Sequence, residues 1–342
     1  MPRYWIILLL SSILFAFISC EQKEFRMDSS VVLRVPAGFD SVPYPPVNAP
    51  TRLRLELGRR LFYDTRLSSD GGTSCASCHR LSLAMTDGRK TSVGLSGLSG
   101  MRNAPTLANV AWAPYLMMEG GVPSLEMQAL APLHDTLEMG LNFDRALEAL
   151  NADESIRDLS WAAYQRANID PYVITHALAV FQRSIISGDS GYDRKKQGST
   201  NAMSDQAIRG MDLFFSDRTQ CSSCHSGVLF TDFGFYNIGL DEVYQDPGRI
   251  RVTFREEDHG KFKTPTLRNI ELTGPYMHDG RFSTLEEVVA FYDRGGEQHP
   301  YRDVRVKPLH LTADEQSDLV EFLKSLTDWN FVQNTNFLPL SP

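Results

Sequence analysis

Cysteine is scarce in this chain, and almost all of it lies in two short motifs. Four of the five cysteines belong to Cys75-Ala76-Ser77-Cys78-His79 and Cys221-Ser222-Ser223-Cys224-His225, which leaves only Cys20. No pair of thiols is left over for a disulfide framework. Few stretches alternate apolar and polar residues with a period of two, and the formal net charge is −8. These shortages argue against a disulfide-rich protein, a β-rich fold and a nucleic-acid-binding protein.

Both motifs have the form Cys-x-x-Cys-His, which is typical of c-type haem attachment. Two thiols one turn apart can add across the vinyl groups of one haem, and the following imidazole then faces the iron. We therefore predict two covalently bound haem c groups. The predicted attachment cysteines are Cys75, Cys78, Cys221 and Cys224, and the predicted iron ligands are His79 and His225. The alternatives are a redox Cys-x-x-Cys pair and a four-cysteine zinc site, but neither needs a histidine after each pair.

The N-terminus has the charge and length of a secretory signal. Arg3 precedes an apolar stretch from Tyr4 to Ile18, which is shorter than the roughly 20 residues that a spanning helix needs. We predict a signal peptide at residues 1–19 and a lipid on Cys20, with ordinary secretion as the alternative. The protein would then lie in the periplasm or on the cell surface, and would contact the membrane only through this lipid. Residues 20–50 are polar and proline-rich, which predicts an extended tether without regular structure.

An internal repeat accompanies the two haem motifs. Pro105-Thr106-Leu107-Ala108-Asn109 recurs 160 positions later as Pro265-Thr266-Leu267-Arg268-Asn269. Apolar residues at helical spacing predict helices at 171–186, 205–215 and 312–327, the last with a capping box at Thr312 and Glu315.

We predict an all-α fold of two cytochrome c-like haem domains, related by internal duplication and joined by long loops. The N-terminal domain would cover residues 51–190 and the C-terminal domain residues 200–330. The boundary falls between Ser187 and Thr200, where Gly, Ser, Asp and Lys accumulate.

At these positions the chain resembles the di-haem cytochrome c peroxidase and MauG family, over residues 52–328. The resemblance rests on residues 57–64, 102–106, 264–269 and 274–280. Members reduce hydrogen peroxide at the N-terminal haem and use the C-terminal haem as a second redox centre. Their electrons come from a small periplasmic cytochrome c or copper protein, or from side chains of a protein substrate. The resemblance implies the same chemistry here, and also a homodimer, because family members are often dimers.

Two positions indicate the MauG-like branch of this family. Leu95 stands where the bacterial peroxidases carry a distal histidine, and leucine cannot ligate iron. Met85 or Met101 could still close that face of the haem. Tyr292, 14 residues after His278, stands where ordinary peroxidases have a methionine ligand, so the resemblance implies a tyrosine-ligated C-terminal haem. The residues alone favour a core aromatic on a helix that starts near Thr284, and only the resemblance makes Tyr292 a ligand.

The resemblance also assigns acid–base and calcium-binding residues. Glu138 matches the catalytic glutamate, which would move the peroxide proton, and Gln128 matches the distal glutamine. Asn103, Thr273 and Pro275 match the ligands of one calcium ion, and oxygen ligands suit that hard cation. Without the resemblance, these residues would be surface or packing residues.

One position departs from the family pattern. Met118 replaces the tryptophan that usually lies between the haems, and Trp112 or Tyr115 could act in its place. A non-catalytic di-haem electron carrier, with six ligands on both irons, is the alternative function. The histidines without motif support are His134, His176, His259, His299 and His310.

Overall fold

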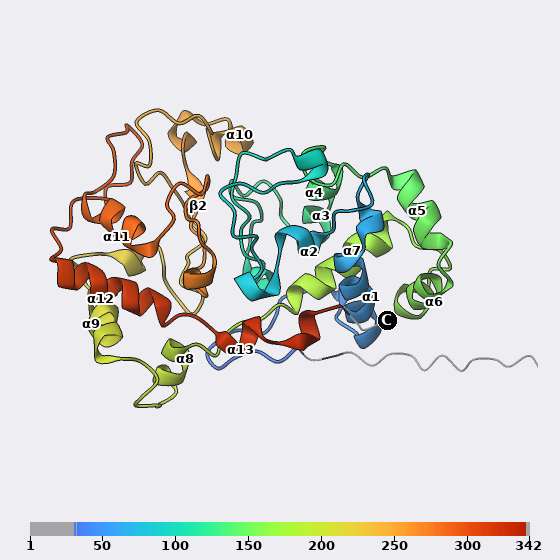
Figure 1. Cartoon of the computed structure of the whole chain (residues 1–342), viewed down its shortest axis with the longest axis horizontal. Coiled ribbons are helices and arrows are strands. Elements are labelled where there is room, and N and C mark those ends of the chain that lie inside the picture. Colours follow the sequence, from blue (N-terminus) through green and yellow to red (C-terminus); the bar gives the residue numbers. More distant parts are fainter. Residues whose placement is uncertain (1–30, 32, 340–342) are drawn as a thin grey trace, which may run out of the picture.

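The computed structural model describes residues 31 and 33–339, so the predicted signal peptide and Cys20 lie outside the described residues. Figure 1 shows two lobes, the N-terminal one in blue to green and the C-terminal one in yellow to red. The red C-terminal end, residues 329–339, crosses to the N-terminal lobe, and Phe331 and Phe337 join its core. Helices dominate both lobes. Strands β1 (Phe235–Tyr236) and β2 (Phe262–Lys263) form a two-stranded antiparallel sheet. Within the described ranges, no helix is both long and apolar enough to cross a membrane.

The α-helices of the N-terminal half are α1 (Arg52–Tyr63), α2 (Cys75–Cys78), α3 (Leu125–Gln128), α4 (Leu130–His134), α5 (Phe143–Asn151), α6 (Glu154–Tyr164) and α7 (Pro171–Arg183). Those that follow are α8 (Gly191–Lys196), α9 (Asp205–Phe214), α10 (Ile250–Thr253), α11 (Leu285–Asp293), α12 (Ala313–Lys324) and α13 (Trp329–Val332). The short 3-10 helices are η1 (Pro46–Asn48), η2 (Thr65–Leu67), η3 (Leu81–Leu83), η4 (Leu95–Gly97), η5 (Val110–Trp112), η6 (Cys221–Ser223), η7 (Glu256–Asp258), η8 (Ile270–Leu272) and η9 (Thr335–Phe337).

Each half is built on a close crossing of two helices at a glycine. A Cβ atom on Gly58 of α1 would lie 2.0 Å from the carbonyl oxygen of Ala177 on α7. A Cβ atom on Gly210 of α9 would lie 1.8 Å from the carbonyl oxygen of Asp318 on α12. Only glycine permits these helices to approach so closely.

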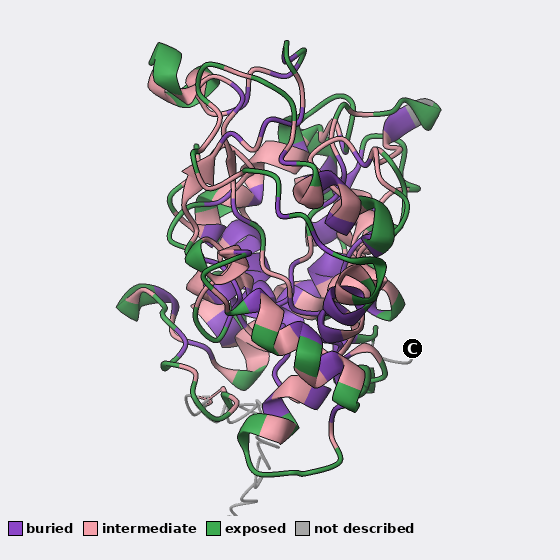
Figure 2. Ribbon diagram, turned by 90° about the vertical axis from the view of Figure 1, so that its left-hand side faces the viewer, coloured by how far each residue is buried: buried purple, intermediate pink, exposed green. Residues whose placement is uncertain are grey.

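The same two crossings bring a pair of phenylalanines together one turn further on. Phe62 and Phe181 lie 5.1 Å apart between ring centroids, and Phe214 and Phe322 lie 5.0 Å apart. All four rings are buried in the cores of their own halves. Figure 2 shows that buried residues gather on the helices in the middle of the molecule, whereas most of the surrounding loop residues are intermediate or exposed.

Local sequence signals set most helix starts. Thr312 caps α12, and its hydroxyl and the Glu315 carboxylate form the expected capping box. The helix predicted at 171–186 ends earlier, at Arg183. Beyond this end, the Ile185 backbone carbonyl accepts a hydrogen bond from the backbone N–H of Asn109 at 2.8 Å. This carbonyl therefore joins two distant segments instead of continuing the helix.

The segment predicted to be a tether has little regular structure, as expected, but its described part is fixed to the body. The Val31 backbone N–H donates to the Pro50 carbonyl at 3.0 Å, and Pro36 lies against Gly188. The Phe39 ring lies 5.3 Å from the Trp112 ring. Asn48 is fully buried, and its side-chain amide donates to Glu126 at 2.8 Å. The prediction of an extended tether was therefore wrong for residues 36–50, because aromatic and amide anchors fix this proline-rich chain to the surface.

The predicted boundary segment, 187–200, is also ordered. It contains α8, whose N-cap Ser190 forms a capping box with Asp193. Ser187 and Ser190 are buried, and Asp193 pairs with Arg268 of the C-terminal half. This connection is a structured element rather than a flexible linker.

Candidate functional site

The first haem motif lies on one helical turn. Cys75 and Cys78 begin and end α2, and both are free thiols that are partly exposed. The His79 Nδ1 atom lies 2.9 Å from the carbonyl oxygen of Met85. Because a carbonyl can only accept, Nδ1 carries the proton, and the lone pair remains on Nε2. Burial lowers the pKa of His79, which favours this neutral, metal-binding form.

The second motif repeats this geometry. Cys221 and Cys224 are free thiols at and just after η6, and the Nδ1 atom of His225 lies 3.1 Å from the carbonyl oxygen of Phe230. Burial lowers the pKa of His225 as well. Each site therefore combines two unpaired thiols with a neutral imidazole, which is the donor set that a covalently attached haem needs.

The two cysteine pairs belong to different cores. Cys75 packs against the core of the N-terminal half, and Cys221 packs against the core of the C-terminal half. Among the described residues, no group of three or more His, Cys, Asp or Glu side chains is arranged to hold a metal ion directly. The alternative of a four-cysteine zinc site is therefore wrong.

Glu138 lies beside the first motif. Burial raises the pKa of both thiols of this motif, that of Cys75 to about 12. The negative charge of Glu138 adds to both shifts. Solvent reaches the Glu138 side chain, but the protein around it partly desolvates the carboxylate. This desolvation, followed by the charge of Asp135, raises the pKa of Glu138.

Leu95 packs against the turn that carries Glu138. The Leu95 backbone N–H donates to the Glu138 carbonyl at 3.2 Å, and the Leu95 side chain is buried. A Cβ atom on Gly140 would lie 2.6 Å from Cδ1 of Leu95, so glycine at this position makes room for the leucine. The loop of Leu95, where the resemblance predicts no iron ligand, thus lies against the turn that carries Glu138, the predicted acid–base residue.

Gln128 is half-buried at the C-terminal end of α3, a short helix capped by Ser124. Among the described residues, desolvation and the charge of Asp135 shift the pKa of Glu138, and Gln128 does not contribute. The proposed cooperation of these two residues stays a prediction.

Tyr292 lies in the last turn of α11, which begins after Thr284 as predicted. Burial raises the pKa of Tyr292 well above its usual range, and the neighbouring Cys221 and Cys224 thiols add to this rise. The phenol therefore lies near the second haem motif. Its ring also lies 5.3 Å from the ring of Phe291, so Tyr292 contributes to the core as well. Ligation by Tyr292 stays a prediction.

The predicted calcium ligands lie at the seam between the halves. The Asn103 backbone N–H donates to the carbonyl of His278 at 2.8 Å, which ties the first half to the loop that follows Pro275. The Asn103 Nδ2 atom donates to the carbonyl of Arg89 at 2.6 Å, so Oδ1 is the amide atom left for an ion. Thr273 lies at the end of η8, on the same loop as Pro275. These oxygen atoms suit a calcium ion, and their role as ligands stays a prediction.

Sequence reasoning missed an ion-paired cluster at this seam. The Arg102 guanidinium donates to Asp246 at 2.7 Å and to Glu119 at 2.5 Å, and all three side chains are largely buried. Arg102 directly precedes Asn103 in a segment that the family resemblance had highlighted, but nothing local in the sequence indicates acidic partners as distant as Asp246.

Two aromatic residues near Met118 are placed very differently. Lys263 of the second half donates its backbone N–H to the Met118 carbonyl at 2.7 Å, so Met118 does lie at the seam. The Tyr115 ring lies 6.3 Å from Phe235 of the second half. Trp112 instead packs against Phe39 of the N-terminal segment. Tyr115 is therefore at the seam between the halves, whereas Trp112 contacts the N-terminal segment, and a relay role for either residue stays a prediction.

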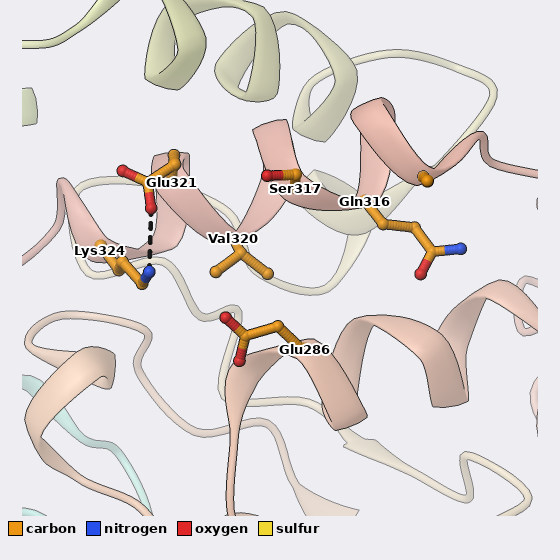
Figure 3. Close-up of a pocket in the computed structure, with 7 residues that line it drawn as sticks. Glu286, Gln316, Ser317, Val320, Glu321 and Lys324 are labelled. Carbon is orange, nitrogen blue, oxygen red and sulfur yellow. Dashed lines mark hydrogen bonds and ion pairs between the residues drawn. The ribbon is translucent and has the colours of Figure 1, made fainter.

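The histidines outside the motifs have ordinary surroundings. His176 stacks on Tyr172 with 3.6 Å between ring centroids, and His259 stacks on His299 at 6.0 Å. A surface pocket between α11 and α12 is drawn in Figure 3, where Lys324 pairs with Glu321 at 2.9 Å. No predicted site residue lines this pocket.

Comparison with known proteins shows the family of this chain. The family model for di-haem cytochrome c peroxidase matches residues 52–201. MauG, the methylamine utilization protein of Methylorubrum extorquens, is 38% identical over 290 residues, which cover 84% of this chain and 82% of the relative. The cytochrome-c peroxidase IdrP1 of Denitromonas iodatirespirans is 36% identical, and the match covers 84% of each chain.

Solved structures agree in fold. The crystal structure of a MauG-like protein associated with microbial copper homeostasis has a TM-score of 0.84 and 34% identity, and the match covers 89% of this chain and 97% of that one. The diheme peroxidase BthA of Burkholderia thailandensis has a TM-score of 0.72 at 23% identity, covering 89% and 94% of the two chains, which supports the fold alone. This chain belongs to the di-haem cytochrome c peroxidase family that includes MauG.

Proposed function

We propose that this protein is an extracytoplasmic c-type di-haem peroxidase of the MauG-like branch, which reduces hydrogen peroxide at the haem on Cys75 and Cys78. The observation that carries the proposal is the buried Leu95, an apolar residue that packs beside Glu138 where a distal histidine would close the site. A haem held by His79 would supply an open coordination position for peroxide and the redox chemistry of its iron.

The two methionines that could close this position are poorly placed to do so. The Met85 carbonyl accepts the hydrogen bond from His79 Nδ1, so Met85 lies behind the proximal ligand. The Met101 side chain is 65% exposed. Both observations support an open distal face.

Glu138 is the acid–base residue of the proposal. Its carboxylate accepts the proton from one peroxide oxygen and returns it to the departing oxygen as the O–O bond breaks. A raised pKa suits this role, because the group must both accept and release a proton near neutral pH. Gln128 would orient the peroxide by hydrogen bonding.

Reduction of one peroxide to two waters takes up two electrons and two protons. We propose that the electrons come from a small periplasmic cytochrome c or copper protein, or from tryptophan or tyrosine side chains of a protein substrate. The C-terminal haem, ligated by His225 and Tyr292, would hold or relay one oxidising equivalent. The net charge of −8 favours a basic partner, whose association would weaken with salt.

The remaining parts of the proposal concern architecture. The matching glycine crossings and haem loops support an origin of the two halves by internal duplication. A calcium ion held by Asn103, Thr273 and Pro275 would stiffen the seam. A lipid on Cys20 would anchor the protein to the membrane. Two copies of the chain would form a homodimer, as members of the family often do.

The test is the spectrum of the purified holoprotein before and after one equivalent of hydrogen peroxide. An open His79 haem gives a high-spin ferric electron paramagnetic resonance signal that decreases when peroxide is added. Replacement Leu95→His should convert this signal to a low-spin one and block the reaction of the oxidised protein. Leu98→His is the matched control, because Leu98 lies in the same loop but is 51% exposed. Two low-spin haems that ignore peroxide in the wild-type protein would instead identify an electron carrier.

A further inference from the structure

The loops behind the two proximal histidines are held in place by different devices. In each half, three successive backbone carbonyls follow the haem motif, and each accepts a hydrogen bond from a side chain. In the N-terminal half, the carbonyls of Leu83, Ala84 and Met85 accept from Thr86, Thr106 and His79, at 2.8, 2.6 and 2.9 Å. In the C-terminal half, the carbonyls of Val228, Leu229 and Phe230 accept from Arg268, Thr266 and His225, at 2.5, 2.6 and 3.1 Å.

Two of these three donors correspond between the halves, and one does not. The two threonines occupy matching positions of the sequence repeat, and the two histidines are the predicted iron ligands. The donor to the first of the three carbonyls differs between the halves. Leu83 is held by Thr86, only three residues away, whereas Val228 is held by Arg268, 40 residues away. The position that matches Arg268 in the N-terminal half is Ala108, which has no polar side chain.

Arg268 is only 1% exposed, and all three of its guanidinium nitrogens donate hydrogen bonds. Nη1 and Nη2 donate to the two carboxylate oxygens of Asp193, at 2.7 and 2.8 Å, while Nε donates to Val228. Asp193 also accepts from the backbone and hydroxyl of Ser190, which caps α8. The Phe39 ring lies 4.8 Å from the guanidinium carbon. Arg268 therefore joins the connection between the halves to the loop behind His225.

We propose that Arg268 is a positioning residue for the C-terminal haem. By fixing the Val228 carbonyl, it holds the loop so that the Phe230 carbonyl stays on Nδ1 of His225. An imidazole that donates its Nδ1 proton is a more basic ligand, and a basic ligand stabilises ferric more than ferrous haem. Loosening the loop raises the reduction potential of that haem alone. This inference rests on the proposed haem at Cys221 and Cys224, but not on peroxidase activity.

The experiment is a redox titration of both haems in the holoprotein, followed by optical spectra. Arg268→Met keeps much of the side-chain length but removes every donor. We expect the ferrous-to-ferric ratio of the C-terminal haem to rise about tenfold at a fixed potential, which is about 59 mV for one electron. The N-terminal haem should not change. Arg209→Met is the matched control, because Arg209 also pairs with an aspartate, Asp318 at 2.8 Å, but donates to no haem loop.

A second variant separates positioning from buried charge. Arg268→Lys keeps a positive charge beside Asp193, but its single ammonium lacks the fork that spans both Asp193 and Val228. We expect it to be less destabilised than Arg268→Met and to show the same rise in potential, even if Arg268→Met proves too unstable to purify. An unchanged C-terminal potential in a folded variant, or full restoration by lysine, would overturn the inference. A wild-type protein without a second haem would instead refute the proposed attachment.

Discussion

Replacement Glu138→Gln tests the chemistry of the proposed site most directly. Glutamine keeps the size and hydrogen-bonding ability of the side chain but cannot carry the peroxide proton. General acid–base catalysis contributes about two to four decades in rate. At about 1.36 kcal/mol per decade, the barrier to the peroxide reaction should rise by roughly 2.7 to 5.5 kcal/mol. Stopped-flow spectroscopy of the N-terminal haem with excess peroxide measures this rate.

The pH dependence of the same reaction gives an independent check. The Glu138 carboxyl must be ionised to accept a proton, and desolvation raises its pKa. The rate should therefore fall as the pH drops through a midpoint above about 4.3, the ordinary value for glutamate. This acid limb should vanish in Glu138→Gln.

The matched control is Glu148→Gln, because Glu148 is exposed on α5. We expect the wild-type rate and the wild-type pH profile from it. A Glu138→Gln rate within threefold of the wild type, with its acid limb intact, would refute the assignment of Glu138 as the proton carrier.

Three further predictions concern ligation, packing and salt. Tyr292→Met should raise the C-terminal haem potential by about a third of the ~0.8 V axial-ligand range, and redox titration that finds no change would mean that the tyrosine is not bound. Gly210→Ala should lower the free energy of unfolding by about 1 to 3 kcal/mol, because its Cβ would meet the carbonyl of Asp318, while Gly100→Ala, with open space around it, should not. Steady-state turnover with a basic electron donor should slow as salt rises; no dependence between about 10 and 150 mM would argue against electrostatic steering.

The parts of the structure that depend on local chemistry could be predicted from the sequence. The helix caps at Thr284 and Thr312 act over three residues, and the structure has both. The haem motifs could be recognised because attachment needs two thiols and an imidazole within one turn. The start of α9 at Asp205 follows in the same way from Ser204 as its cap.

Interactions between distant segments could not be predicted. Arg268 and Asp193 are 75 residues apart, and Arg102 and Asp246 are 144 apart, so neither pair leaves a periodic signal. The docking of Phe39 depends on a surface that exists only after folding. Strands β1 and β2 are two residues long, too short for an alternating pattern.

The docked N-terminal segment limits how far the enzyme could stand from a membrane. If Cys20 carries the lipid that we propose, about 11 residues separate it from Val31, whose backbone N–H donates to the Pro50 carbonyl at 3.0 Å and so fixes the chain to the body. A fully extended chain spans at most about 3.6 Å per residue, so this segment reaches no more than about 40 Å. The folded body would therefore stay within this distance of the bilayer surface. Any redox partner would have to come equally close to the membrane to react with it.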